Sequence, residues 1–353
     1  RRGVFILIIL ALFIAGSLSL FAWRAPLLKQ GGLFAPISRE GALVLNNLLL
    51  TAACATVFFG TLYPLALEQF TGEKITVGAP FFNMTAGLLL LALGFLTPFG
   101  FSLAWKRGDL LGVAQRLSAA LAAGFVAFVA LIAYAHGGPV LAPIAAGLAI
   151  FVVLGSLAEI LARAWRRGVP LSSALARARG LPLSFWGGAL AHVGAGIVLL
   201  GLAATGFGAE TVATMRVGAP QTVGPYEIVV DSLGEREGAN YRETVAAMTI
   251  RSGGLAVASI EPARRQFATR QMATTQAGIA TLHLGQIYVS IGDPDAGGGV
   301  PARLYWKPLV TLIWLGACLM ALAGAFSLAD RRLRLGAPAR AKSSAAAAAA
   351  AAR

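Results

Sequence analysis

The chain has 353 residues, of which 57% are hydrophobic and 12% are charged, and its mean hydropathy is +0.74. These values exclude an ordinary soluble domain and indicate a polytopic membrane protein. The formal net charge of +14 would suit a nucleic-acid-binding protein, but the positions of the basic residues give it a different origin.

Seven apolar segments are long enough to cross a hydrocarbon core of roughly 30 Å as helices. They cover residues 4–23, 42–67, 83–105, 117–135, 143–164, 185–204 and 308–328. We therefore expect six spanning helices within residues 1–206, a β-rich domain over 207–306 and a seventh spanning helix within 307–334. A low-complexity tail, in which eight alanines precede Arg353, follows over 335–353.

The short loops differ in their content of basic residues, and this difference predicts orientation. Lys and Arg gather after the first, third, fifth and seventh apolar segments, whereas the loops 68–82 and 136–141 have Lys74 as their single basic residue. The basic loops are therefore predicted to be cytoplasmic, and the large segment 207–306 lies outside. This topology accounts for the net charge, so no nucleic-acid partner is expected. It also places Arg1 outside, against the rule, and we expect further chain before it.

Residues 207–306 have the composition of a β domain. Short segments rich in Val, Ile, Thr and Tyr alternate with Gly, Pro, Asp and Asn, and the sequence Ser252-Gly253-Gly254 favours a hairpin turn. Strands are expected at 211–217, 226–232, 244–251, 255–260, 287–291 and 302–306. The sequence contains no GxSxG, HExxH or Walker A motif. We expect a small domain, tethered to the membrane at both ends, that docks a partner or covers a site.

One histidine, His192, interrupts the sixth apolar segment. Ionisable side chains at membrane depth are costly and usually face a bundle interior or a site. Gly188 and Gly196 are each four residues away, on the same helical face. Such a surface suits close packing of another helix or a flat macrocycle whose metal binds the imidazole. From the residues alone, an interhelical hydrogen bond, a haem or metal ligand and a proton relay all stay open.

Two polar pairs lie inside or at the ends of apolar segments. Asn46 and Asn47 are expected to cross-link helices or, as the alternative, to line a quinone or substrate cavity. Glu159 is expected to pair with Arg163, one helical turn later.

The cysteines and the other two histidines favour structural roles. Cys54 and Cys318 have no CxxC partner and are interpreted as small buried hydrophobic residues, not as a disulfide or a metal site. His136 is interpreted as a solvated residue at the outer interface, and His283 as a surface or structural residue of the β domain.

A series of segments along the chain matches one known family. In order, they are RRGVFIL, ISREGALVLNNLLL, GTLYPL, TGEKITVGAPFFN, FWGGALAHVGAGIVLLG, IGDPDAG and RLYWKP. Together they resemble the C-terminal half of the CcmF family, the membrane haem lyase subunit of System I cytochrome c maturation. The resemblance covers residues 1 to about 334.

The resemblance implies a role in attaching haem to apocytochrome c in the inner membrane of a bacterium. Family members accept haem from the chaperone CcmE at the periplasmic face and act with CcmH and sometimes CcmI. They also hold a haem b between two transmembrane histidines, which reduces the incoming haem with electrons from quinol. His192 matches the second of these histidines, so the resemblance implies that it is an axial ligand, with Gly188 and Gly196 beside the ring. Loop 291–297 (IGDPDAG) is expected to contact CcmH or the apocytochrome.

The sequence departs from the family in one respect. The family's WWD segment, its two periplasmic haem histidines and its first transmembrane haem histidine precede the matched region, whereas the first histidine here is His136. This chain alone is therefore not expected to hold haem between two histidines, and we expect a split-gene product or part of a longer protein. Two rival classes stay open: a secondary transporter with His192 as proton relay, although no internal repeat is evident, and a structural assembly subunit without haem.

Overall fold

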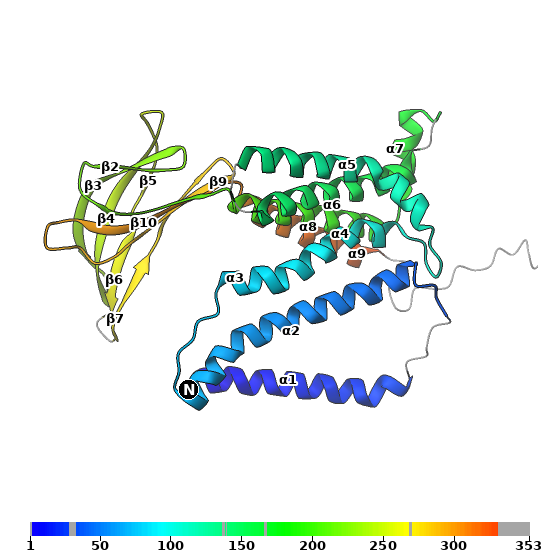
Figure 1. Ribbon diagram of the computed structural model, residues 1–353, viewed down its shortest axis with the longest axis horizontal. Coiled ribbons are helices and arrows are strands. Elements are labelled where there is room, and N and C mark those ends of the chain that lie inside the picture. Colours follow the sequence, from blue (N-terminus) through cyan, green and yellow to red (C-terminus); the bar gives the residue numbers. More distant parts are fainter. Residues whose placement is uncertain are drawn as a thin grey trace, which may run out of the picture.

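The computed structural model describes residues 2–27, 33–135, 138, 140–165, 168–267 and 270–330. These residues form a group of long apolar helices with a β sandwich at one end of the group (Figure 1). Seven helical segments in this part of the chain are long and apolar enough to cross a membrane. The predicted fold class, a polytopic helical membrane protein with a β domain before its last spanning helix, is confirmed.

The spanning helices follow the predicted apolar segments closely. They are α1 (Arg2–Arg24), α2 (Arg39–Thr71), α3 with α4 (Ala79–Phe82 and Leu88–Ser102), α5 (Leu110–Ala135), α6 (Leu141–Ala164), α8 (Leu183–Thr205) and α9 (Thr311–Ala329). A 3-10 turn, η1 (Ala25–Leu27), follows α1, and a π-helical turn, η2 (Asn83–Gly87), joins α3 to α4. The helix α5 begins seven residues before the predicted segment, because Asp109 accepts a 3.0 Å hydrogen bond from Gly112 N and starts the helix among polar residues.

One helix was not expected. The basic loop after α6 contains the short amphipathic helix α7 (Leu171–Gly180), whose Ala174 is buried while Leu171 and Leu175 are exposed. The indole Nε1 of Trp186, at the start of α8, donates a 3.1 Å hydrogen bond to the Ala178 carbonyl. This bond ties α7 to the helix that follows it.

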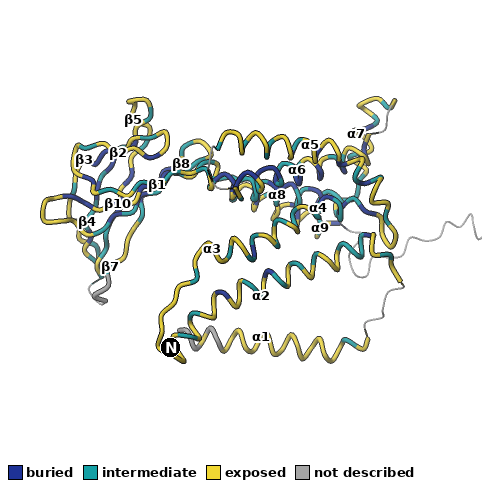
Figure 2. The backbone as a smooth tube through the Cα atoms, in the orientation of Figure 1, coloured by how far each residue is buried: buried dark blue, intermediate teal, exposed yellow. Residues whose placement is uncertain are grey.

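Small residues let α8 pack tightly on α9. A Cβ added to Gly194 of α8 would lie 2.8 Å from the Gly316 carbonyl oxygen, and one added to Gly316 of α9 would lie 2.6 Å from the Gly194 carbonyl oxygen. The two backbones therefore touch where the helices cross, as in other membrane helix pairs with small residues at the contact. Among the helices, Figure 2 shows that buried residues concentrate on α6 and α8, whereas α1 is exposed over the part whose burial is described, residue 5 and residues 8–24 with Arg24 at its end.

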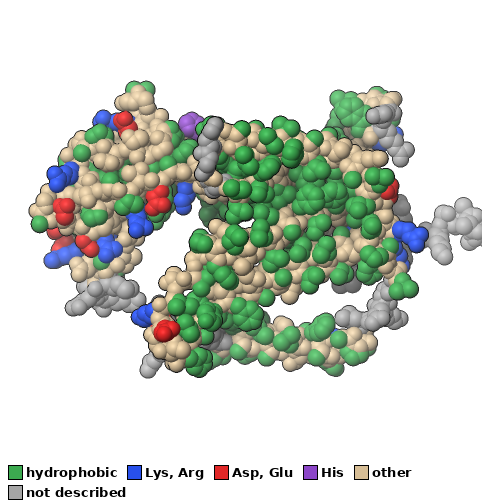
Figure 3. All heavy atoms as spheres, in the orientation of Figure 1, with side chains coloured by type: hydrophobic (Ala, Val, Ile, Leu, Met, Phe, Trp, Pro, Cys, Tyr) green, Lys and Arg blue, Asp and Glu red, His purple; other side chains and the backbone are tan. Residues whose placement is uncertain are grey.

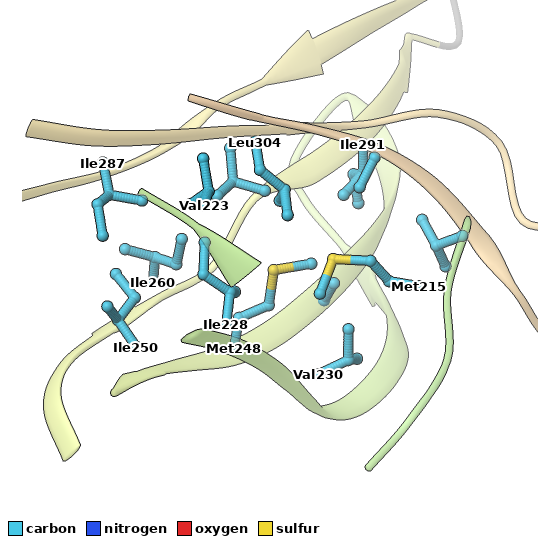
Figure 4. Close-up of a cluster of buried hydrophobic side chains, with 14 of the residues drawn as sticks. Met215, Val223, Ile228, Val230, Met248, Ile250, Ile260, Ile287, Ile291 and Leu304 are labelled. Carbon is cyan, nitrogen blue, oxygen red and sulfur yellow. The ribbon is translucent and has the colours of Figure 1, made fainter. Parts of the chain in front are cut away.

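The β sandwich has two antiparallel sheets. Its strands are β1 (Ala209–Met215), β2 (Pro220–Val223), β3 (Tyr226–Glu237), β4 (Tyr241–Ser252), β5 (Leu255–Ile260), β6 (Ala263–Phe267), β7 (Arg270–Gln276), β8 (Gly278–Leu282), β9 (Gly285–Ile291) and β10 (Val300–Lys307). One sheet has the order β1-β10-β9-β8, and the other has the order β2-β3-β4-β6-β7 with β5 paired to β4. Alternate residues of both sheets meet in one apolar core that includes Met215, Ile228, Met248, Ile287 and Leu304 (Figure 4).

Each of the six predicted strands overlaps an observed strand. Five lie within the observed bounds, whereas the first was predicted to extend to residue 217 and ends at Met215. The strands β2, β6, β7 and β8 were missed. Three of the missed strands, β2, β6 and β8, have only four or five residues, and polar residues in segments such as ARRQF weaken the apolar alternation. The predicted turn is confirmed, because Gly253 (φ 56°) and Gly254 (φ 80°) connect β4 to β5 with the two positive φ angles that favour glycine.

The surface differs between the two parts of the molecule. Hydrophobic side chains cover the helices, while Lys, Arg, Asp and Glu side chains gather on the sandwich (Figure 3). A hydrocarbon environment for the helices and an aqueous one for the sandwich explain this division.

The sandwich is connected to the helices through two neighbouring strands. The helix α8 leads into β1 and the strand β10 leads into α9, and these two strands pair from Ala209↔Trp306 to Met215↔Val300. The α8–α9 helix pair therefore continues into a two-stranded antiparallel ladder.

Candidate functional site

A cavity of about 750 Å³ lies between α2, α4 and α8, and we call it the His192 cavity. Its volume is within the range of small-molecule and cofactor sites. Most of its walls are apolar, from leucine, alanine and phenylalanine side chains of α2 and α4. The residues with polar side chains that line it are Ser38, Arg39, Asn46, Thr97 and His192.

The imidazole of His192 forms part of the cavity wall from α8. Its Nδ1 is buried and has no hydrogen-bond partner among the described residues. The carbonyl of Gly188, one turn earlier, interacts with the ring but lies outside ordinary hydrogen-bond geometry. A buried polar atom without a partner is costly, so it marks a place where a ligand or a small rotation of the ring completes the bonding.

The ring of Phe101, near the end of α4, organises this end of the cavity. Its centroid is 4.9 Å from the His192 ring and 5.7 Å from the Phe185 ring, on which it stacks with an interplanar angle of 17°. The guanidinium carbon of Arg39 lies 5.6 Å from the same centroid. A Cβ at Gly188 would come within 3.2 Å of Phe101 Cε2. The glycine therefore allows Phe101 to approach the backbone of α8.

Gly188 and Gly196 have different neighbours. A Cβ at Gly196 would lie 2.6 Å from Val153 Cγ2 and 3.1 Å from the Ala149 carbonyl oxygen of α6. The small-residue surface around His192 is therefore divided: Gly188 faces the cavity wall at Phe101, and Gly196 supports a contact between helices.

Comparison with known proteins agrees with this architecture. The family profile described as the CcmF C-terminal beta-sandwich matches residues 206–308. Over 344 residues, the chain is 54% identical to cytochrome c-type biogenesis protein CycK of Bradyrhizobium diazoefficiens, covering 97% of this chain and 52% of that protein. Over 338 residues it is 35% identical to cytochrome c-type biogenesis protein CcmF of Pseudomonas aeruginosa, covering 95% of this chain and 50% of that protein.

Over nearly all of its length, the chain is similar to about half of CcmF-type proteins. It also has the fold of a solved structure of "Cytochrome c Heme Lyase CcmF", with a TM-score of 0.61 and 21% identity over 83% of this chain and 46% of the solved one. The chain spans about half the length of the curated relatives it matches. The candidate site lies entirely in the helical part, outside the segment that the family profile covers.

The expected polar pairs are placed as follows. The Glu159–Arg163 pair is confirmed, with a distance of 2.8 Å between Glu159 Oε1 and Arg163 Nε. Asn46 lines the His192 cavity, and its Nδ2 donates a 3.2 Å hydrogen bond to Asn47 Oδ1. Neither asparagine has a side-chain bond to another helix among the described residues, so the interhelical cross-link is not observed.

The remaining candidates lie away from the cavity. Cys54 and Cys318 are unpaired, as expected, but the prediction that they are buried is wrong, because both are exposed. An apolar segment has an outer face as well as an inner one, and hydropathy does not distinguish them. His283 is an exposed turn residue between β8 and β9, and His136 lies outside the described residues. No cluster of three or more potential metal-binding side chains occurs in the described part of the chain.

Sequence reasoning did not identify Arg39 or Phe101 as site residues. Arg39 was counted among the basic residues of a loop, whereas it is the first residue of α2. Arg39 and Asn46 are seven residues apart, which is about two helical turns, so both lie on one side of α2. This spacing could have identified Arg39 as a neighbour of Asn46 from the sequence. Phe101 is one of many phenylalanines in apolar segments, and no sequence signal separates it from the others.

Proposed function

We propose that this chain forms the C-terminal part of a cytochrome c-type haem lyase, and that His192 is an axial ligand of a haem b in the His192 cavity. The observation that carries the proposal is the position of the His192 imidazole in the wall of a large apolar cavity. The names of its relatives, cytochrome c-type biogenesis proteins, support the pathway.

The residues of the cavity fit a haem. An imidazole ligand needs one ring nitrogen free for iron and the other held by a hydrogen bond that fixes the ring. The Gly188 carbonyl is the acceptor available for Nδ1–H, which leaves Nε2 for the metal. The apolar walls from α2 and α4 exclude water and suit the faces of a macrocycle.

When bound, haem b supplies an electron that keeps the iron of the incoming haem reduced. The chain contributes the ligand, its orientation through Gly188 and Phe101, and the exclusion of water from the site. In our proposal quinol would donate this electron, and a second histidine ligand would be supplied from outside this chain. Haem for attachment is accepted from CcmE, and its vinyl groups are joined to the cysteines of apocytochrome c with CcmH, and in some cases CcmI, as partner.

The β sandwich is assigned to docking, and its loop 291–297 is the proposed contact for CcmH or the apocytochrome. The loop is held by its own bonds: Asp295 Oδ1 accepts hydrogen bonds from Gly297 N and Gly299 N at 3.0 and 2.6 Å. Arg264 pairs with Asp293 at 3.1 Å. We place this domain in the periplasm and the helices in the bacterial inner membrane, because the basic loops are at the opposite ends of the helices.

The test is the reduced-minus-oxidised visible spectrum of the protein purified from its native membrane with its partners. The wild type is compared with His192→Ala and with His283→Ala, the exposed histidine of the sandwich. We expect a b-type band that is lost or strongly weakened in His192→Ala and unchanged in His283→Ala. A band that persists in a folded His192→Ala protein contradicts the ligation. A wild type without such a band favours a structural assembly subunit.

A further inference from the structure

The guanidinium of Arg39 is a cation without a counter-ion at the wall of the His192 cavity. It forms no ion pair within the part of the chain that the structure describes, and it is half-buried. The other guanidinium at this end of the site, that of Arg163, is already paired with Glu159 and lies 4.3 Å from the Phe185 ring centroid. Arg39 also interacts electrostatically with Arg163 and Glu159. The neighbouring Glu40 has a buried Oε2 without a hydrogen-bond partner among the described residues, but it is not part of the cavity wall.

The position of Arg39 is fixed by backbone contacts. Its N–H donates a 3.0 Å hydrogen bond to the Ala104 carbonyl, and Gly108 N donates a 2.8 Å bond to the Ile37 carbonyl. Ser38 caps α2 by accepting a 3.0 Å bond from Gly41 N. These bonds join the start of α2 to the connection between α4 and α5. The guanidinium then lies over one side of Phe101, while His192 contacts the same ring.

A half-buried cation beside apolar walls is favourable only when an anion or water balances its charge. Water is a poor partner in a cavity built from leucine and phenylalanine side chains. The first residues of α2 also line the cavity, and the positive end of the helix dipole adds to the preference for an anion. The site therefore combines an apolar volume, one imidazole and an anion-binding end, separated by a single aromatic ring.

We infer that Arg39 binds a propionate carboxylate of the haem and thereby sets the orientation of the macrocycle in the cavity. The inference rests on the proposed function, because it takes haem as the occupant. A haem carries its two carboxylates at one edge. An imidazole ligand alone leaves the macrocycle free to rotate about the bond to iron, whereas a cation at one end of the cavity favours the rotation that brings this edge to it. Arginine suits this task because its planar guanidinium can bind a carboxylate through two hydrogen bonds.

The test compares two probes that differ only at the carboxylates, haemin and haemin dimethyl ester. Each is titrated into haem-depleted protein that retains its native partners, as wild type, Arg39→Gln and Arg39→Lys. The matched control is Arg24→Gln, an exposed arginine at the end of α1 on the same side of the membrane. We expect Arg39→Gln to weaken haemin binding about tenfold and to leave the affinity for the ester unchanged. Arg39→Lys keeps most of the preference for haemin, and Arg24→Gln behaves as the wild type.

A second readout is the midpoint potential of the bound haem. Loss of the cation leaves the propionate charge unbalanced, which stabilises the ferric state, so we expect a lower midpoint potential in Arg39→Gln and a smaller change in Arg39→Lys. Equal weakening of haemin and ester would show that Arg39 acts only by packing on Phe101, and it would overturn the inference. So would a wild type that binds both probes equally, a comparison that needs no variant to fold.

The two proposals fail in different ways. A b-type band that persists in His192→Ala overturns the proposed function. A band that is lost in His192→Ala but shows no difference between haemin and its ester overturns the role of Arg39 alone.

Discussion

The backbone N–H of Ser184, in the first turn of α8, donates a 3.0 Å hydrogen bond to the carboxylate of Asp330, the residue that follows α9. Asp330 is 5% exposed. The first N–H groups of a helix have no acceptor within the helix, and a carboxylate there also favours the helix dipole. The end of the last spanning helix therefore caps the start of the helix that carries His192.

Removal of this cap is expected to destabilise the helix pair. We predict that Asp330→Ala lowers the free energy of unfolding by about 1 to 2 kcal/mol, within the range for loss of an N-terminal cap. Asp330→Asn keeps an oxygen acceptor and has a smaller effect. Thermal unfolding of the detergent-purified protein measures both. Equal stability of Asp330→Ala and wild type would contradict the capping role.

The crossing of α8 and α9 is expected to tolerate no added side chain. Gly194→Ala and Gly316→Ala each place a Cβ within 2.8 Å of a backbone oxygen on the other helix. Because the backbone cannot move aside as a flexible side chain does, we predict that each substitution lowers the free energy of unfolding by about 1 to 3 kcal/mol. Gly324→Ala is the matched control on α9, since nothing lies within 4 Å of its added Cβ. A control as destabilised as Gly316→Ala would mean that helix packing is not the cause.

The stability of the sandwich is expected to depend on pH through Glu243. Its side chain is 0% exposed and receives hydrogen bonds from Arg265 Nε and, at 2.7 Å, from Arg236 Nε. The bond from Arg265 is the main cause that lowers the pKa of this carboxyl below its ordinary value of 4.5. The folded state therefore holds the proton less tightly than the unfolded state. The resulting stability is fully present above the ordinary pKa and is lost as the pH falls through the lowered value.

Hydrogen–deuterium exchange of the β3 and β4 amides, corrected for the intrinsic effect of pH on exchange, measures this dependence. We predict that protection decreases between neutral pH and about pH 3 in the wild type. In Glu243→Gln the protection of these amides at neutral pH is lower than in the wild type, and it depends less on pH. Glu237→Gln removes the exposed pair with Arg242, whose partners are 73% and 82% exposed, and should change little. A Glu243→Gln protein with the wild-type profile would refute the assignment.

The orientation in the membrane can be tested with single cysteines. In a variant whose Cys54 and Cys318 are replaced by alanine, Ser172→Cys in α7 and Ser259→Cys in β5 add exposed thiols on the two sides of the helices. We predict that a membrane-impermeant maleimide labels Ser259→Cys in intact spheroplasts and labels Ser172→Cys only after permeabilisation. The reverse pattern would place the sandwich in the cytoplasm.

The spanning helices were predictable because a long apolar segment has one stable structure in a membrane, whatever its neighbours are. Their ends were less predictable, since capping groups such as Asp109 and Ser38 extend a helix into polar sequence. In the sandwich, strands with regular alternation were found, but β6 and β7 are held by pairing with β4 and with each other. Such pairing depends on the tertiary structure and cannot be predicted from the local amino-acid composition.

The candidate site was likewise predictable from the sequence only in part. His192 was identifiable because an ionisable residue in an apolar helix is rare. Arg39 and Phe101 meet it only because α2, α4 and α8 converge at one end of the helix group. Gly188 and Gly196 have the same spacing from His192, yet one faces the cavity and the other faces α6. Which face of a helix meets which neighbour depends on packing, and a single sequence does not specify it.

The direct passage from α8 into β1, and from β10 into α9, has a mechanical consequence. The paired strands and the packed helices form one continuous arm without a flexible joint of more than a few residues between them. His192 lies 13 residues from the sandwich end of α8, a distance of about 20 Å along the helix axis. A displacement of the sandwich would therefore act along this arm on the helix that carries the imidazole.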